Sequence, residues 1–209
     1  MAIVVEHAKR RRRILETALD VFMEEGFENA TCQKIAGRCK ITRTTLYLYF
    51  RNRREIFNYS IKQLMAEVER DIMGVKEDQV LSYPGKIKKT LFLILGRLEE
   101  NRRLLSVILD YLLSLSRASG SPAAPKGRGG VSLADTRVRR RTIRLRHILA
   151  QMVIEGIKAG QLKKMDVGTV DTMLYALIES AIFRLAVLKR DSAAELGGAV
   201  ELIIKELSV

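Results

Sequence analysis

The sequence is poor in the residues that mark several classes of protein. Its 209 residues include no tryptophan, three prolines, two cysteines and two histidines. Cys32 and Cys39 are too few for a disulfide framework and lack the spacing of a zinc motif, so we expect two reduced, packed thiols. His7 and His147 are far apart in the sequence. No metal site and no cofactor is therefore predicted.

Long apolar runs are also missing. No stretch reaches the ~18 residues that a membrane-spanning helix requires, and the N-terminus lacks the apolar core of a signal peptide. We recognise no carboxylate pair, nucleophile and base, or phosphate-binding loop, so an enzyme is not expected. These absences predict a cytoplasmic protein that does not enter membranes and whose function is not catalytic.

The residues that are abundant favour helices. Hydrophobic residues make up 47% and charged residues 29% of the chain, as in ordinary globular proteins. Leu, Ile, Ala, Arg, Lys and Glu recur at helical spacing, and few segments alternate as strands do. The length is enough for one large or two small domains. We predict an all-α fold.

The positive charge lies in two patches. The formal net charge is +13, and residues 1–54 contain 12 Lys and Arg against 6 Asp and Glu. Residues 126–147 contain 8 basic residues and 1 acidic residue, while the remaining residues are balanced. The first patch coincides with the candidate DNA-binding segment described next, as neutralisation of phosphates requires. The second patch has no assigned role, although it could wrap further DNA.

Residues 31–53 read as two short helices joined by a tight turn. Thr31 and Thr42 can each cap a helix, because a threonine hydroxyl accepts a hydrogen bond from a free N–H of the first turn. Leu46 and Phe50, four residues apart, point toward a core. A second helix that begins with hydroxyls and a cation suits the major groove of DNA. The alternative is that this is one of the many short helix pairs that bind nothing.

The segment from about Arg13 to Phe57 resembles the DNA-binding domain of the TetR family of bacterial transcription regulators. The resemblance rests on Ile14, Ala18, Phe22, Gly26-Phe27, Thr31, Ile35-Ala36, the run from Ile41 to Tyr47, Tyr49-Phe50 and Arg53. It implies an N-terminal three-helix helix-turn-helix domain (1–54), followed by a helical ligand-binding and dimerisation domain (55–209).

By this resemblance we expect a set of DNA contacts. Arg43, Thr44 and Thr45 are predicted to reach base edges, and the residues predicted to contact phosphates are Thr31, Lys40, Thr42, Tyr47 and Arg53. Three positions depart from the family's usual pattern, which has Gly at Lys40, often Gly at Thr44 and often Lys at Arg53. Because Gly tolerates a positive φ and Lys does not, either the turn differs slightly or Lys40 is strained.

The first two long helices are expected at about 9–25 and 53–73. Residues 1–8 read as a frayed arm, and the basic run of residues 9–13 would form a flexible extension that touches phosphate. Gly26 would end the first helix in a left-handed conformation, with Phe27 packed back over the last turn. Residues 74–84 read as a break, with Pro84 in the first turn of the next helix.

The following helices are expected at about 85–98, 101–116 and 135–160. Asn101 is a candidate cap between the first two. Residues 117–134 contain two prolines and four glycines, so they read as a flexible loop.

A small-molecule pocket in the second domain is implied by the resemblance. The candidate lining residues are Met65, Tyr111, Arg141, Met152 and Tyr175. Arg141 lies at the edge of an apolar stripe, where it either snorkels to water or pairs with an anionic ligand. If it faces the pocket a hydrophobic anion is favoured, and a flat hydrophobic cation is the competing class.

The last two helices are expected at about 167–189 and 192–207, and the first of them has apolar residues nearly all round. Such helices must be buried on every side, either within a helical monomer domain or in a dimer interface. We expect a homodimer through these helices, as the family has, and a roughly palindromic operator in double-stranded DNA.

The predicted function is a dimeric, sequence-specific repressor that a small hydrophobic effector releases from its operator. The alternative is a basic helical DNA-binding protein that has no effector and little sequence preference. A protein that binds membrane surfaces is a weaker third possibility, because the apolar stripe beside the second basic patch continues as core.

Overall fold

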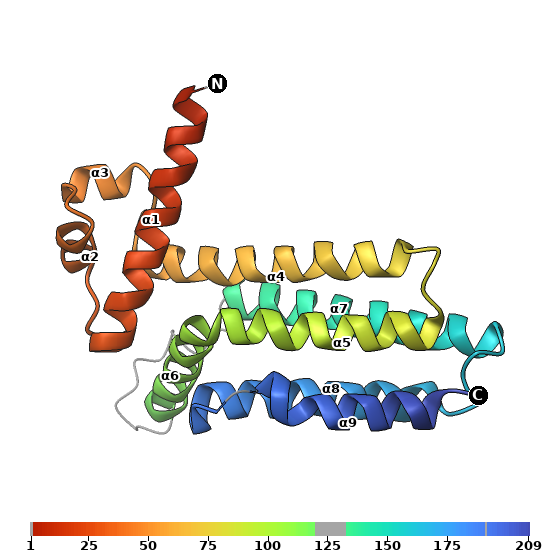
Figure 1. The fold of residues 1–209 in the computed structure, drawn as a ribbon. Coiled ribbons are helices and arrows are strands. Elements are labelled where there is room, and N and C mark those ends of the chain that lie inside the picture. Colours follow the sequence, from red (N-terminus) through yellow and green to blue (C-terminus); the bar gives the residue numbers. More distant parts are fainter. Residues whose placement is uncertain (1, 120–132, 191) are drawn as a thin grey trace. The chain divides into compact units, whose positions relative to one another are not determined.

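A computed structural model describes the backbone of residues 2–119, 133–190 and 192–209 and the side chains of residues 6–111, 142–190 and 195–209. Its elements are α1 (Ala2–Glu25), α2 (Cys32–Arg38), α3 (Arg43–Tyr47), α4 (Arg53–Glu77), α5 (Tyr83–Glu100), α6 (Arg102–Ser119), α7 (Leu133–Lys158), α8 (Val167–Phe183), the π-helix η1 (Arg184–Leu188) and α9 (Ser192–Leu207) (Figure 1). In the described part of the chain, the only β-pairing is an isolated bridge between Leu162 and Ser208. The all-α prediction is confirmed.

The chain forms two compact units. The first comprises Met1–Gln63 and Arg103–Val131, and the second comprises Leu64–Arg102 and Ser132–Val209. The domain boundary expected at 54/55 lies within the first turn of α4, whereas the units divide this helix after Gln63. The segment that contains α6 belongs to the first unit, although it follows α5 directly in sequence. None of the described helices is both long and apolar enough to cross a membrane.

The core of the first unit is an aromatic cluster. The Phe27 ring lies 5.3 Å from that of Phe22, 5.1 Å from that of Phe57 and 4.7 Å from that of Tyr111 on α6. Gly26 adopts a φ of +77° and ends α1, as predicted, which turns Phe27 inward until it is only 1% exposed. The cluster therefore holds α1, α4 and α6 around the loop that precedes α2.

The prediction of a frayed arm is wrong for residues 2–8, because α1 begins at Ala2. The basic run of residues 9–13 consequently lies beyond the first turn, where the helix dipole opposes cations little. Two ion pairs with i,i+4 spacing, Glu6 with Arg10 and Glu16 with Arg12, further offset the repulsion among its cations.

The turn between α2 and α3 contains a residue in the left-handed region. Both predicted caps are formed: the Thr31 hydroxyl accepts from the Lys34 N–H at 3.2 Å, and the Thr42 hydroxyl accepts from the Thr45 N–H at 3.1 Å. Lys40 has a φ of +55°. Of the two possibilities for this turn, the structure has the strained one, since a residue with a Cβ occupies a conformation that favours glycine.

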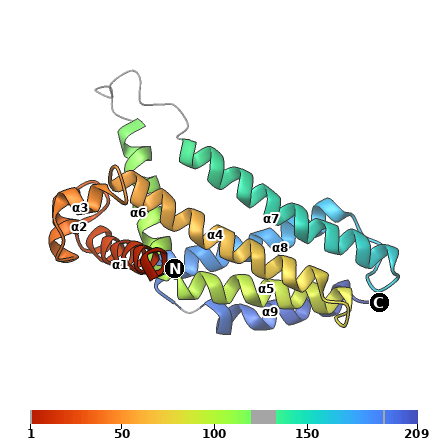
Figure 2. The ribbon, with the colours of Figure 1, turned by 90° about the horizontal axis from the view of Figure 1, so that it is seen from above.

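The second unit is built around α5. This helix packs on α9, α7 and α8, and α7 packs on α8; Figure 2 shows α5 and α9 side by side. The side chains of Leu91, Met152 and Val200, from three of these helices, are 0% exposed. The buried Thr90 hydroxyl is satisfied by the Met152 sulfur at 3.8 Å.

The break predicted from Gly74 onward is wrong in its first part, because α4 continues through Gly74 to Glu77. The last turn of α4 is stabilised by contacts with α5 and α7. The Lys86 ammonium donates to the Lys76 carbonyl at 2.8 Å, and the Lys76 ammonium donates to Gln151 at 2.7 Å. Pro84 lies in the first turn of α5, as predicted, and Ser82 caps that turn.

The remaining expected boundaries are close to the observed ones. Asn101 caps the end of α5, and its side chain donates to the Arg97 carbonyl at 2.8 Å. Gly160, with a φ of +68°, follows the end of α7. The predicted loop at 117–134 is shorter at both ends because α6 and α7 extend into it, and residues 120–132 lie outside the described part of the chain. The helix expected at 167–189 is α8 continued by η1.

Replacing Lys40 by Gly should relieve the strain in the turn. We expect Lys40→Gly to be more stable than Lys40→Ala by about 0.5–1 kcal/mol, because the left-handed penalty exceeds the extra entropy of glycine in the unfolded chain. Lys40→Ala is the matched control, since it removes the same charge and keeps the Cβ. Urea denaturation followed by circular dichroism measures the difference, and equal stabilities would contradict the assignment of strain.

Two glycines of the second unit should respond in opposite directions to the same substitution. A Cβ on Gly156 would lie 2.6 Å from Leu162 and 2.8 Å from the Cβ of Tyr83, whereas a Cβ on Gly74 would meet no atom within 4 Å. We expect Gly156→Ala to cost about 1–3 kcal/mol by overpacking and Gly74→Ala to gain about 0.5–1 kcal/mol by helix propensity. Equal shifts in the thermal unfolding of the two variants would be incompatible with this packing.

Candidate nucleic-acid interface

The exposed face of α3 carries a cation and hydroxyls. Arg43, Thr44 and Tyr47 are exposed, and Leu46 on the opposite side is 0% exposed. The Arg43 Nε donates to the Tyr47 hydroxyl at 2.8 Å, and its guanidinium lies 5.2 Å from the centre of the Tyr47 ring. The two side chains therefore form an ordered pair on the surface, with further N–H donors of Arg43 free for a ligand.

The hydroxyls at the start of α3 are engaged with each other. Those of Thr42 and Thr45 are 2.8 Å apart, and Thr42 also caps the helix. A hydroxyl has one donor and two acceptor positions, so both side chains keep capacity for an outside partner. Thr44 has no such local contact among the described residues, and it projects from the exposed face.

On α2 the acidic end of α1 neutralises the cations. Arg38 donates to both carboxylate oxygens of Glu24, at 2.6 and 2.7 Å, and Lys34 donates to Glu25 at 2.5 Å. The hydrogen bond from Arg38 holds the pKa of the Glu24 carboxyl below its usual value. Thr31 is exposed at the cap of this helix. The free cation near the turn is Lys40, whose ammonium has no partner among the described residues.

Arg53 is turned toward the protein. Its Nη1 donates to the carbonyls of Glu28 and Ala30, its Nη2 donates to the Glu28 carboxylate at 2.8 Å, and its guanidinium lies 5.1 Å from the centre of the Phe27 ring. The structure thus brings seven of the eight predicted DNA-binding residues to the surface of α2, the turn and α3, and gives Arg53 internal partners.

Three further arginines of the first unit were not assigned to DNA binding from the sequence. Arg51 and Arg54 flank Arg53 and are exposed, with no side-chain partner among the described residues. Arg11 of α1 lies 4.4 Å from the centre of the Tyr59 ring, and its buried Nε has no hydrogen-bond partner in the described structure. The clustering of arginines at the start of α4 is visible in the sequence, but which of them is free depends on the fold.

The predicted ligand-binding residues are not gathered at one described site. Met152 is 0% exposed in the core, and Met65 is half-buried on α4. The ring of Tyr175 lies under the Arg146 guanidinium at 4.6 Å, and burial raises the pKa of its hydroxyl. Tyr111 belongs to the first unit, whereas the other candidates belong to the second. The side chain of Arg141 lies outside the described residues.

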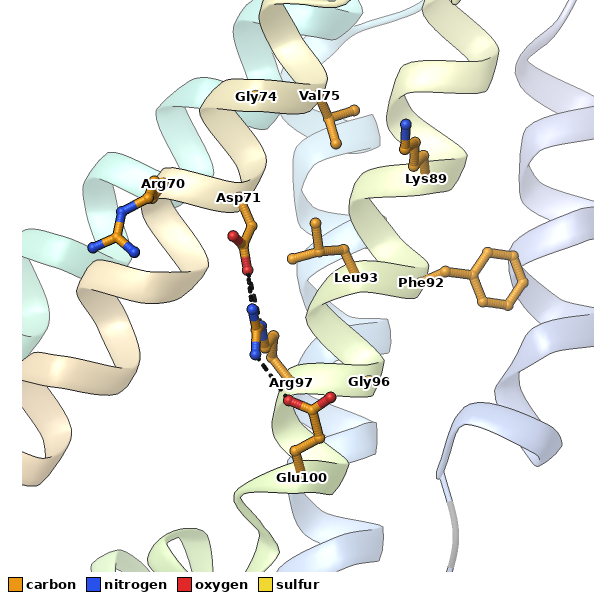
Figure 3. Close-up of a pocket in the computed structure, with 10 residues that line it drawn as sticks. All are labelled: Arg70, Asp71, Gly74, Val75, Lys89, Phe92, Leu93, Gly96, Arg97 and Glu100. Carbon is orange, nitrogen blue, oxygen red and sulfur yellow. Dashed lines mark hydrogen bonds and ion pairs between the residues drawn. The ribbon is translucent and has the colours of Figure 1, made fainter. Parts of the chain in front are cut away.

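Two surface pockets of the second unit are lined by other residues. The first, of about 570 Å³, lies between α4 and α5, where Arg97 donates to Asp71 at 2.6 Å and to Glu100 at 3.0 Å (Figure 3). The second, of about 590 Å³, lies along α8 from Asp166 to Ala176. No group of three or more His, Cys, Asp and Glu side chains within the described part could hold a metal ion.

The surface of α2 and α3 lies within a segment that matches a known family. Residues 14–59 match the model of bacterial regulatory proteins of the tetR family. The chain is 29% identical over 80 residues to the HTH-type transcriptional regulator YerO of Bacillus subtilis, and the match covers 35% of this chain and 28% of that protein.

Solved structures resemble the fold over nearly the whole chain. The TetR family transcriptional regulator PfmR from Thermus thermophilus superposes with a TM-score of 0.71 at 18% identity, over 94% of this chain and 96% of that chain. The transcriptional regulator FadR from Bacillus subtilis, in complex with stearoyl-CoA, gives 0.58 at 23% identity, over 94% and 98%. Residues 14–59 thus match the DNA-binding segment of the tetR family of bacterial regulatory proteins, and the chain shares its all-α fold with a solved regulator of that family.

Proposed function

We propose that the protein is a dimeric, sequence-specific transcriptional repressor, which leaves a palindromic operator when a small hydrophobic effector binds. The observation that carries the proposal is the exposed face of α3, which is capped by Thr42, anchored by buried Leu46 and furnished with the Arg43–Tyr47 pair. The match of residues 14–59 to the tetR family supports DNA as the ligand of this face.

The roles at the interface follow from the chemistry of the side chains. Arg43 can donate two hydrogen bonds to a guanine edge, and the hydroxyls of Thr44 and Thr45 can donate to or accept from a base. Thr31, Lys40, Thr42 and Tyr47 are suited to phosphates, since each offers a donor at the exposed surface. These contacts would place the first turn of α3 in the major groove.

A second copy of the chain is the proposed occupant of an apolar surface on α8, η1 and α9. Five large apolar side chains are exposed there: Met173 39%, Phe183 55%, Val187 43%, Leu188 47% and Leu202 68%. An apolar surface on the last helices favours association. A two-fold dimer would present two copies of α3 to half-sites about 34–36 Å apart, or further. This arrangement agrees with a palindromic operator.

The effector is proposed to be a hydrophobic anion. The support is the stearoyl-CoA bound to the FadR structure that this fold resembles. On this chain Met65, Met152 and Tyr175 are retained as candidate contacts, with Arg141 for the anionic group. Tyr111 is better explained by its packing on Phe27 and Phe57 in the first unit.

Selection of random-sequence DNA at two salt concentrations tests the proposal. We expect one palindrome to be enriched, and we expect Arg43→Ala to weaken binding to it by about 1–3 kcal/mol, because a bidentate contact to a base is lost. Lys164→Ala, an exposed lysine of the second unit, is the control and should bind as the wild type does. Binding that depends steeply on salt without an enriched site would favour the non-specific alternative. Release of the selected operator by stearoyl-CoA or a long-chain fatty acid tests the effector in the same assay.

Charge placed on the apolar surface of α9 should separate the dimer. We expect Leu202→Glu to sediment as a monomer at concentrations at which the wild type is a dimer, because it would bury an unpaired carboxylate in the interface. Val80→Glu is the matched control, since Val80 is 94% exposed on the turn before α5. The proposed interface would be contradicted if the Leu202→Glu variant still formed a dimer. It would also be contradicted if the wild type were a monomer.

A further inference from the structure

Arg53 has more internal partners than any other cation near the candidate interface. Three charge-assisted hydrogen bonds join its guanidinium to residues 28–30, and the Phe27 ring lies beneath it. Its side chain is 30% exposed, whereas those of Arg51 and Arg54 are exposed. The planar fork of arginine suits this arrangement, because it can bind two carbonyls and a carboxylate at once.

The segment that Arg53 holds determines where α2 begins. The Ala30 carbonyl, which accepts from Arg53 at 3.0 Å, directly precedes Thr31, the residue that caps α2. Since α2 packs on α3, the position of this carbonyl affects the position of the DNA-facing helix. Arg53 is thus connected to α3 through the start of α2, by contacts that all lie in the first unit.

The other end of the segment is held as firmly. The Phe27 N–H donates to the Asp110 carboxylate at 3.4 Å, and the Phe27 ring packs against those of Phe57 and Tyr111. The ring on which the guanidinium lies is therefore itself fixed. A segment clamped at Phe27 by α6 and at residues 28–30 by Arg53 has little freedom to shift.

We infer that Arg53 is a positioning residue of the DNA-reading surface and does not bind phosphate itself. It acts by holding residues 27–30, through which it sets α2 and then α3. The inference rests on the proposed DNA binding, and it departs from the sequence-based expectation that a cation at this position touches the DNA backbone. A lysine cannot replace it, because a single ammonium group lacks the fork that spans the two carbonyls and the carboxylate.

Three variants of the full chain test the inference: Arg53→Lys, Arg53→Gln and Arg54→Gln. Arg54→Gln is the matched control, because it removes the same charge one residue away and breaks no described contact. Binding to the selected palindrome is measured over a range of salt concentrations, at a temperature at which circular dichroism shows every variant folded. Hydrogen exchange of the amides at 27–34 is measured on the protein without DNA.

We expect Arg53→Lys to weaken binding at every salt concentration by at least about tenfold, the cost of one misplaced base contact, without changing the salt dependence. Exchange at 27–34 should accelerate in both Arg53 variants and stay unchanged in Arg54→Gln. The Tm of the Arg53 variants should fall by roughly 5–10 °C, because charge-assisted hydrogen bonds are lost.

Wild-type affinity in Arg53→Lys, together with a salt slope that falls by about 0.9 in Arg53→Gln, would overturn the inference and make Arg53 a phosphate contact. Unchanged exchange at 27–34 in the Arg53 variants would also overturn it. If the wild type bound no DNA, the proposed function would fail, whereas the exchange measurement would still test the clamp.

Discussion

The proposed DNA-binding surface depends on a helix that is too short to be stable by itself. α3 has five residues, and isolated helices below about 12–15 residues are barely stable in water. Its geometry is therefore imposed from outside, by the Thr42 cap and by Leu46 and Phe50, which are 0% and 1% exposed. The same holds for α2, whose seven residues begin at the Thr31 cap. Packing beneath these helices is consequently part of how the surface recognises a ligand.

Although the net charge is +13, several cations of the first unit are paired with carboxylates. Acids of the first unit bind the cations of α2 and the start of α4, in the pairs of Arg38 with Glu24 and Arg53 with Glu28. These exposed or half-exposed pairs contribute little to stability, but they direct the long side chains away from the exposed face. Lys40 and Arg43 are left free of acidic partners among the described residues, on the turn and the helix that carry the predicted base contacts.

The features that the sequence predicted correctly are those set by one residue and its neighbours in the chain. The caps at Thr31 and Thr42, the left-handed Gly26 and the first-turn Pro84 belong to this class. The features that were not predicted are set by contacts between distant segments of the chain. α4 passes Gly74 because Lys86 binds the carbonyl of Lys76 beyond it. Arg53 faces inward because the loop at 27–30 supplies its partners, and Tyr111 lies in the first unit because α6 packs there. None of these three contacts can be predicted from composition and spacing.

The large apolar side chains exposed on the last helices are explained by the proposed dimer. Each phosphate contact adds only about 0.9 to the salt slope, so a single copy of the DNA-binding surface gains limited affinity from any one phosphate contact. Linking two copies of the DNA-binding surface makes the second binding event intramolecular. This can raise the overall affinity for DNA by about 10²–10⁴ without a new contact. In the proposed dimer, burial of the exposed Leu202 and Phe183 would contribute to DNA binding, because it would hold the two DNA-binding surfaces at a fixed spacing. In the proposed dimer, specificity can rest on a few base contacts from each α3, because both copies of α3 must fit the site at once.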